Sequence, residues 1–220
     1  MSGELGMRLD VPELTSERSG YLVVPPLEEQ AAKLQTALER EPNSIVCHSQ
    51  GAWVLALALG VRPQPREQRL TLLAPPLTPA VERMSRRLAE PSEYEKNIAG
   101  DYGGTHGVIR GNTEQDPIVV SGDYWEEVSD PGFPPRLLVT QLLNEFEAPR
   151  IIRPGNDRRL GPQTEEYRQL ETDAVVHVDT IGRATHSFSG IEEQVARAAF
   201  TGCVFDVATQ GGTYAVTISS

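Results

Sequence analysis

A serine occupies the centre of the run Cys47-His48-Ser49-Gln50-Gly51, between a short apolar stretch, Ser44 to Cys47, and residues 50–61, which are apolar almost all round. These flanks predict a buried strand followed by a buried helix. A sharp turn between two such elements exposes a serine hydroxyl as a nucleophile, and it requires small residues two positions away, such as the cysteine and glycine here. We therefore predict Ser49 as a nucleophile and the Gln50 N–H as an oxyanion donor at the start of the helix. The simpler alternative is that Ser49 only caps the helix.

A serine hydroxyl is a poor nucleophile until a base removes its proton, and histidine is the usual base. Among the four histidines, His186 lies in a small polar loop, Arg183 to Gly190, after the last predicted core strand. Open α/β sheets place their chemistry at such loops. We predict His186 as the base, and the alternative is a solvated loop histidine. Simpler interpretations suit the others: His48 packs in the core, His106 lies among glycines in the long insertion described below, and His177 is a strand residue.

An acid must orient the imidazole from a different strand. The stretch Arg150 to Asp157 is an apolar strand pattern that runs into a Pro-Gly-Asn turn, with Asp157 at its tip. We predict Asp157 as the acid. The alternative is a turn aspartate that bonds its own backbone. Asp179 and Asp173, near the ends of the next predicted strand, are rival acids.

The elements that position these residues alternate along the chain. Strands are expected at 44–47, 70–74, 150–153 and 174–178, and helices at 27–38, 50–61, 134–146, 162–170 and 190–200. Alternation of this kind predicts an α/β fold whose parallel sheet is covered by helices on both faces.

One long segment interrupts this alternation. Residues 78–133 contain an arginine-rich amphipathic helix and then a stretch rich in Gly, Tyr and Asp. An insertion of this length between core strands often covers a site. We therefore predict residues 1–77 and 134–220 as the core domain and residues 78–133 as a cap or lid.

Both ends of the chain offer further strand candidates. Residues 7–14 and 21–24 are weak candidates near the N-terminus. Near the C-terminus, residues 204–208 and 214–218 predict a strand pair with a Gly-Gly turn. An unpaired apolar hairpin would expose its edges. We hypothesise that it pairs with the N-terminal side of the sheet, or with a second subunit in a homodimer.

Composition narrows the classes of function. The 220 residues carry a formal net charge of −11, which argues against binding nucleic acid or an anionic membrane. Cys47 and Cys203 are too few for a disulfide framework, and Met1 to Asp10 lacks a signal-peptide pattern. The longest apolar run, Ala52 to Leu59, is too short to span a membrane. We expect a cytoplasmic protein without a cofactor or metal, since no cluster of His and carboxylate residues has ligand spacing.

Five segments together resemble the α/β-hydrolase superfamily, and small bacterial esterase-like members most. They are the elbow Val46 to Ala52, the strand Leu70 to Pro76, the cap exit Val119 to Glu127, the acid turn Ile152 to Asp157 and the histidine loop Thr185 to Gly190. The resemblance covers roughly residues 27 to 200. It implies a mostly parallel sheet with a cap insertion, and a triad in the order Ser49, Asp157, His186.

The resemblance also implies an activity. We expect a serine hydrolase that cleaves a small carboxylic ester through an acyl-enzyme on Ser49, with thioesters and amides open to the same chemistry. The sequence departs from the superfamily because the 48 residues before Ser49 contain only weak strand candidates and no His-Gly loop, which leaves the second oxyanion donor unassigned. The alternative is therefore a catalytically weak or inactive member that binds a small molecule without a complete oxyanion hole.

Overall fold

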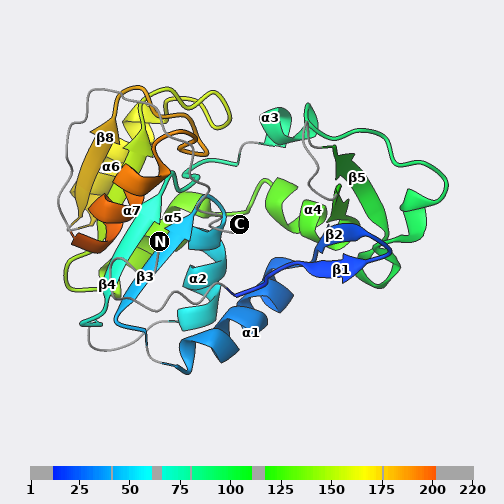
Figure 1. Ribbon diagram of the computed structural model, residues 1–220, viewed down its shortest axis with the longest axis horizontal. Coiled ribbons are helices and arrows are strands. Elements are labelled where there is room, and N and C mark those ends of the chain that lie inside the picture. Colours follow the sequence, from blue (N-terminus) through cyan, green and yellow to red (C-terminus); the bar gives the residue numbers. More distant parts are fainter. Residues whose placement is uncertain are drawn as a thin grey trace.

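Two sheets organise the chain into a larger and a smaller lobe (Figure 1). The computed structural model describes residues 12–40, 42–60, 66–79, 81–110, 117–174 and 176–201. The larger sheet has the order β3 (Ser44–His48), β4 (Arg69–Leu73), β7 (Arg150–Pro154), β8 (His177–Ile181), and all its strands are parallel. The carboxyl ends of these strands therefore meet at one edge.

Helices cover both faces of the larger sheet, because alternate residues of its central strands point in opposite directions. Leu73 and Ile152 pack against α7 (Glu192–Thr201) on one face. Leu72 and Ile151 belong to the main core on the other face. That core is formed with α1 (Leu27–Leu38), α2 (Gly51–Leu59), α5 (Pro135–Asn144) and α6 (Thr164–Asp173). The predicted α/β class is confirmed.

Helix α1 has the predicted bounds because its local pattern is unambiguous. Leu27, Ala31 and Leu34 recur at helical spacing and are buried. Glu28 and Glu29 lie in the first turn, where acidic side chains favour the helix dipole.

The last predicted strand was wrong by three residues. Residues 174–178 were expected, whereas β8 begins at His177 and continues to Ile181. The apolar residues before it suggested a buried strand, but β8 alternates with polar residues and pairs on one side only among the described strands. Asp179 of β8 forms an ion pair with Arg150 of β7. The register thus depends on a contact between strands that a local pattern does not contain.

The smaller sheet joins segments from two distant parts of the chain. Its order is β1 (Ser16–Arg18), β2 (Tyr21–Val24), β6 (Ile118–Ser121), β5 (Thr105–Ile109), and β2 runs parallel to β6. The weak strand at residues 21–24 is confirmed, whereas residues 12–14 form no strand. The division at residues 78 and 133 stays a prediction. This sheet nevertheless combines two strands that precede residue 77 with two from the proposed cap.

Shorter elements complete the smaller lobe. They are α3 (Val81–Ser85), the 3₁₀ turns Glu95–Asn97 and Gly100–Tyr102, and α4 (Gly122–Ser129). Helix α4 connects the lobes, because Tyr124 and Val128 are buried in the main core. The Leu27 N–H at the start of α1 donates to Glu127 Oε2 over 2.7 Å, which ties α4 to the larger lobe.

Several predictions lie outside the described residues. These are the strand candidates at 204–208 and 214–218, Cys203 and the beginning of the candidate at 7–14. The proposed homodimer through the C-terminal strands therefore stays a hypothesis. Among the helices that the structure describes, none has the length and apolar character needed to cross a membrane.

Candidate active site

Ser49 occupies a strained turn between β3 and α2. Its φ is 53°, in the left-handed region that a non-glycine residue adopts only under constraint. The Ser49 N–H donates to the Leu73 carbonyl of the neighbouring strand over 2.8 Å, which holds the turn in place. A Cβ atom on Gly51 would lie 3.7 Å from Cys47 Cβ, so the two positions that flank the turn face each other. The predicted requirement for small residues there is met.

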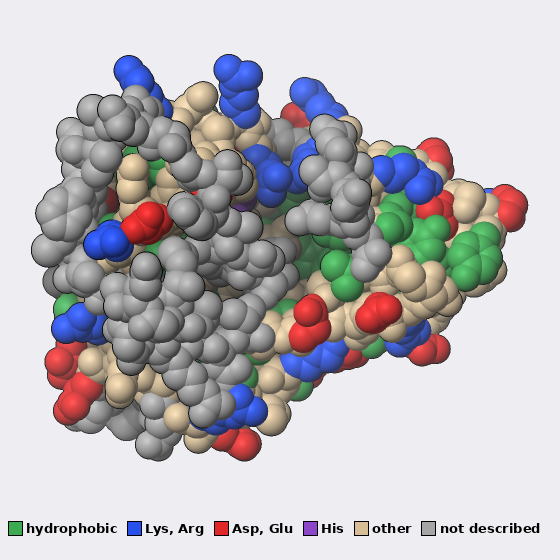
Figure 2. All heavy atoms as spheres, viewed as in Figure 1, with side chains coloured by type: hydrophobic (Ala, Val, Ile, Leu, Met, Phe, Trp, Pro, Cys, Tyr) green, Lys and Arg blue, Asp and Glu red, His purple; other side chains and the backbone are tan. Residues whose placement is uncertain are grey.

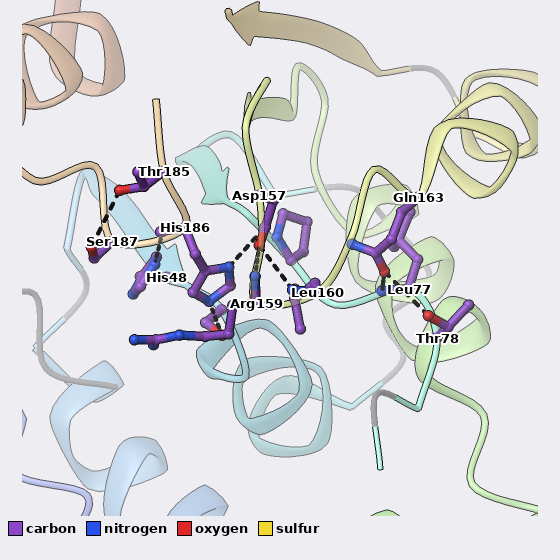
Figure 3. A network of polar contacts seen from close by, with 12 residues as sticks. His48, Leu77, Thr78, Asp157, Arg159, Leu160, Gln163, Thr185, His186 and Ser187 are labelled. Carbon is purple, nitrogen blue, oxygen red and sulfur yellow. Dashed lines mark hydrogen bonds and ion pairs between the residues drawn. The ribbon is translucent and has the colours of Figure 1, made fainter. Parts of the chain in front are cut away.

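The structure brings the three predicted catalytic side chains together, and Figure 3 shows the His186 ring beside the Asp157 carboxylate. His186 Nε2 lies 2.9 Å from Ser49 Oγ, and His186 Nδ1 lies 2.8 Å from Asp157 Oδ2. The side chains of His186 and Asp157 are only 4% and 5% exposed. Because the carboxylate can only accept, Nδ1 carries the proton and Nε2 is free to accept from the serine hydroxyl. This arrangement can move a proton from Ser49 to His186.

The acid turn fixes the Asp157 carboxylate through its second oxygen. Asp157 Oδ1 accepts hydrogen bonds from the N–H groups of Arg159, at 2.9 Å, and Leu160, at 2.8 Å. The turn-aspartate alternative is therefore also realised, one oxygen for the turn and one for the imidazole. Burial alone would raise the pKa of Asp157, but the bonds from His186 and the two N–H groups outweigh it and lower the pKa.

The rival acids lie elsewhere. Asp179 is inside β8, where it pairs with Arg150. Asp173 is the last residue of α6, half-exposed and 3.9 Å from Arg136. Neither bonds His186 among the described contacts.

The acid turn and the histidine loop are also joined through their backbones. The Gly155 N–H donates to the Ile181 carbonyl over 2.9 Å, and the Asn156 N–H donates to the Ala184 carbonyl over 3.0 Å. Phe188 is buried beside α7 and anchors the far end of the histidine loop. The relative position of acid and base thus depends on close contact between two loops.

Replacing Gly155 by alanine should separate these loops. A Cβ atom there would lie 2.6 Å from both the Cα and the carbonyl oxygen of Gly182. We expect Gly155→Ala to lower the free energy of unfolding by about 1–3 kcal/mol, as overpacking does, together with kcat. Gly182→Ala is the matched control, because its Cβ would meet nothing within 4 Å. Urea titration of both variants checks this, and equal stabilities would contradict it.

His48 makes a polar contact that the sequence reasoning missed. Its Nε2–H donates to the His186 carbonyl oxygen over 2.8 Å, and the two rings lie 5.1 Å apart. Burial lowers the pKa of His48 to about 4, so the ring is neutral near pH 7. The sequence places His48 next to Ser49, which indicates that it lies near the site. Only the folded chain shows that its side chain points to the His186 backbone. His48 is therefore placed to position the His186 backbone.

The lowered pKa of His48 predicts acid sensitivity. In the unfolded chain the imidazole takes up a proton near pH 6.5, whereas in the folded chain it does so only near pH 4. Between these two pH values the unfolded state binds more protons than the folded state. The free energy of unfolding therefore decreases by roughly 2–3 kcal/mol as the pH is lowered through this range. His48→Gln keeps an N–H donor but does not titrate. The difference in unfolding free energy between wild type and this variant should shift in favour of the variant from pH 7 to pH 4, and a constant difference would refute the prediction.

Gln50 lies between Ser49 and α2, as the predicted oxyanion position requires. The first N–H groups of a helix have no partner within it, so they are available to an anion. The Gln50 side chain points elsewhere: its Oε1 accepts from the Tyr124 hydroxyl of α4. Burial raises the pKa of Tyr124, which keeps that hydroxyl a donor. The role of the Gln50 N–H stays a prediction.

The link between β2 and α1, residues 25–27, offers no free backbone N–H. Pro25 and Pro26 have no N–H, and the Leu27 N–H is bonded to Glu127. The second donor therefore remains unassigned.

The other two histidines lie away from this cluster. His106 stacks on Trp125, with ring centroids 4.4 Å apart, and burial lowers its pKa. The side chain of His177 is 73% exposed and contacts Asp179. Within the described residues, no group of three His, Cys, Asp or Glu side chains could hold a metal ion.

The larger sheet is parallel and carries the three side chains at its carboxyl edge. The strained Ser49 follows β3, Asp157 follows β7 and His186 follows β8. This arrangement resembles that of the α/β-hydrolase fold. No protein-family model matches the sequence, and no curated protein matches it. The parallel sheet and its flanking helices, as predicted, are present in the described residues.

Solved structures share part of this arrangement at low identity. An esterase domain from a Rhodothermus marinus protein is 16% identical, with a TM-score of 0.49 over 80% of this chain and 66% of its own. The α/β hydrolase GrgF from Penicillium sp. sh18 is 13% identical, with a TM-score of 0.45 over 78% and 70%. A thioesterase domain from the curacin biosynthetic pathway is 13% identical, with a TM-score of 0.39 over 82% and 71%. Conclusions about chemistry therefore depend on the residues of this chain.

Proposed function

We propose that this chain is a serine hydrolase that cleaves a small carboxylic ester, with thioesters and amides as chemically related substrates. The observation that supports this most is the continuous hydrogen-bonded series from Ser49 through His186 to Asp157. Such a series activates a hydroxyl at neutral pH because the imidazole takes its proton and the carboxylate stabilises the resulting imidazolium.

The proposed reaction has two halves. In the first, His186 takes the Ser49 proton, Ser49 Oγ bonds to the acyl carbon, and the alcohol leaves with the proton from His186. In the second, water gives a proton to His186 and attacks the acyl carbon. The bond from the acyl carbon to Ser49 Oγ then breaks, His186 returns the proton to that oxygen, and the acid is released. The Gln50 N–H would stabilise the oxyanion in both halves.

Covalent labelling and hydrolysis test this proposal together. A fluorophosphonate probe should label the protein in a one-to-one ratio, and peptide mass spectrometry should place the label on Ser49. A panel of p-nitrophenyl esters with two to eight acyl carbons should show turnover and report the size of the acyl pocket. A Ser187→Ala variant is the control, because Ser187 is an exposed serine in the histidine loop. Label on any residue other than Ser49, with no turnover of any ester, would refute the proposal.

The alternative is a catalytically weak or inactive member that binds a small molecule. The lack of a His-Gly loop before the elbow favours it, since losing one oxyanion donor typically costs about a hundredfold to a thousandfold in rate. The same labelling experiment separates the two: a protein that binds ligand but takes no label at high probe concentration is the binder.

A further inference from the structure

A cavity of about 490 Å³ lies beside the acid turn and is lined mainly by arginines. Arg158 and Arg159 come from the acid turn, and Arg86 and Arg87 follow α3 in the smaller lobe. Glu82 is the remaining lining residue. We call this site the arginine cavity. Figure 2 shows Lys and Arg side chains spaced along the upper edge of the molecule, from the larger lobe to the position of α3.

The charges in the arginine cavity are not balanced. Glu82 pairs with Arg86, with 3.5 Å between its carboxylate and the guanidinium. Among the described residues, the side chains of Arg87, Arg158 and Arg159 form no ion pair. Three arginines that form no ion pair among the described residues contrast with a chain whose formal net charge is −11. Like charges repel when gathered in this way, so a bound anion would stabilise the group.

The electrostatics of Arg159 agree with this imbalance. Burial and then the nearby charge of Arg87 lower the pKa of Arg159, while the Asp157 carboxylate raises it by less. Arg87 and Arg159 therefore act on each other across the cavity although they come from different lobes.

The arginine cavity adjoins the candidate active site. The backbone N–H of Arg159 donates to Asp157 Oδ1, so this arginine belongs to the turn that orients His186. Figure 3 shows its side chain extending past the His186 ring on the side of His48. The Arg159 charge also contributes to the lowered pKa of His48, which places the guanidinium within electrostatic reach of the His48–His186 pair.

We propose that Arg87 and Arg159 bind a carboxylate or phosphate group of the substrate, so that the site selects esters or thioesters that carry a negative charge. This inference deepens the proposed function and rests on it. A guanidinium presents paired N–H donors that match the oxygens of either anion. From their position beside the triad, the guanidinium groups of Arg87 and Arg159 would hold the charged end of a substrate while Ser49 faces its acyl carbon.

The first test measures binding without catalysis. Ser49→Ala protein is titrated with glutarate and, separately, with inorganic phosphate in a calorimeter. We expect saturable binding of at least one anion, and Arg87→Gln or Arg159→Gln in that background should weaken it roughly tenfold to a hundredfold. Arg168→Gln on α6 is the control, because Arg168 pairs with Glu165 outside the cavity. The preferred anion tells a carboxylate site from a phosphate site, and no binding of either, or equal loss in the control, overturns the proposal.

The second test compares two esters that differ in charge. Mono-(4-nitrophenyl) glutarate carries a carboxylate, and its methyl ester is the neutral counterpart. Wild type should prefer the anionic ester in kcat/KM, and Arg87→Gln and Arg159→Gln should lower that preference roughly tenfold or more. Arg87→Lys, which keeps the charge and loses the fork, should lie between.

The outcomes separate this inference from the function beneath it. Turnover of both esters with no preference, unchanged in the arginine variants, overturns the anion site and leaves the hydrolase intact. Anion binding in the Ser49→Ala titration, together with no turnover and no fluorophosphonate label in wild type, refutes the hydrolase and supports the site.

Discussion

Replacing Ser49 by alanine is expected to lower kcat for a p-nitrophenyl ester by about 10⁴- to 10⁶-fold, the size of loss typical of a serine triad without its nucleophile. The reason is that Ser49 Oγ is the group that His186 Nε2 faces at 2.9 Å, and alanine has no atom to bond to the acyl carbon. Steady-state release of p-nitrophenol, with protein concentrations checked by absorbance, measures this directly. Ser187→Ala, from the same loop as His186, should keep the wild-type rate.

Non-additivity provides a sharper version of the Ser49 result. Ser49 and His186 act as one unit. The kcat of the double variant Ser49→Ala, His186→Ala should therefore be within a few-fold of the kcat of Ser49→Ala. If each substitution instead multiplied the loss of the other, the two side chains would act independently and the proposed proton transfer would be wrong. Near-wild-type hydrolysis by Ser49→Ala would exclude the acyl-enzyme altogether.

Replacing Asp157 by asparagine should lower kcat by about 10³- to 10⁴-fold, because it changes the imidazole tautomer. Oδ1 accepts from two backbone N–H groups, so the asparagine oxygen must take that place and its NH₂ must face His186. Nδ1 would then have to accept a hydrogen bond, which moves the proton to Nε2. An Nε2 that carries a proton cannot take one from Ser49.

The matched control for Asp157 is a rival acid. Asp173→Asn changes a half-exposed carboxylate at the end of α6 and should alter the rate by less than about twofold, as surface changes do. Equal losses in the two variants would mean that Asp157 has no special part in the reaction.

The pKa values of Asp157 and Cys47 shift in opposite directions. Hydrogen bonds lower the pKa of Asp157, so the carboxylate stays charged in its buried position. Burial raises the pKa of Cys47 to about 12, which keeps that thiol neutral although it lies two residues from Ser49. The structure thus favours the serine over the neighbouring cysteine as nucleophile.

Local patterns in the sequence were sufficient for the elements that position the site. The spacing of apolar residues within one element predicted the bounds of α1, and it placed the strand before Ser49 and the helix after it to within two residues. The elbow was predictable for the same reason, since its strand, small residues and helix all lie within about 15 residues of one another. Asp157 and His186 could be chosen because each follows a strand pattern, and the carboxyl ends of parallel strands share an edge.

Tertiary structure decided what depends on partners that are far apart in the chain. The parallel pairing of β2 with β6, the register of β8 through Asp179 and Arg150, and the bond from His48 to the His186 carbonyl leave no trace in any local pattern. The arginine cavity likewise exists only because α3 and the acid turn meet in space. A periodic sequence reports which face of an element is buried, because burial acts on each residue separately. Which surface covers that face is set by contacts between distant residues, and only the folded chain contains them.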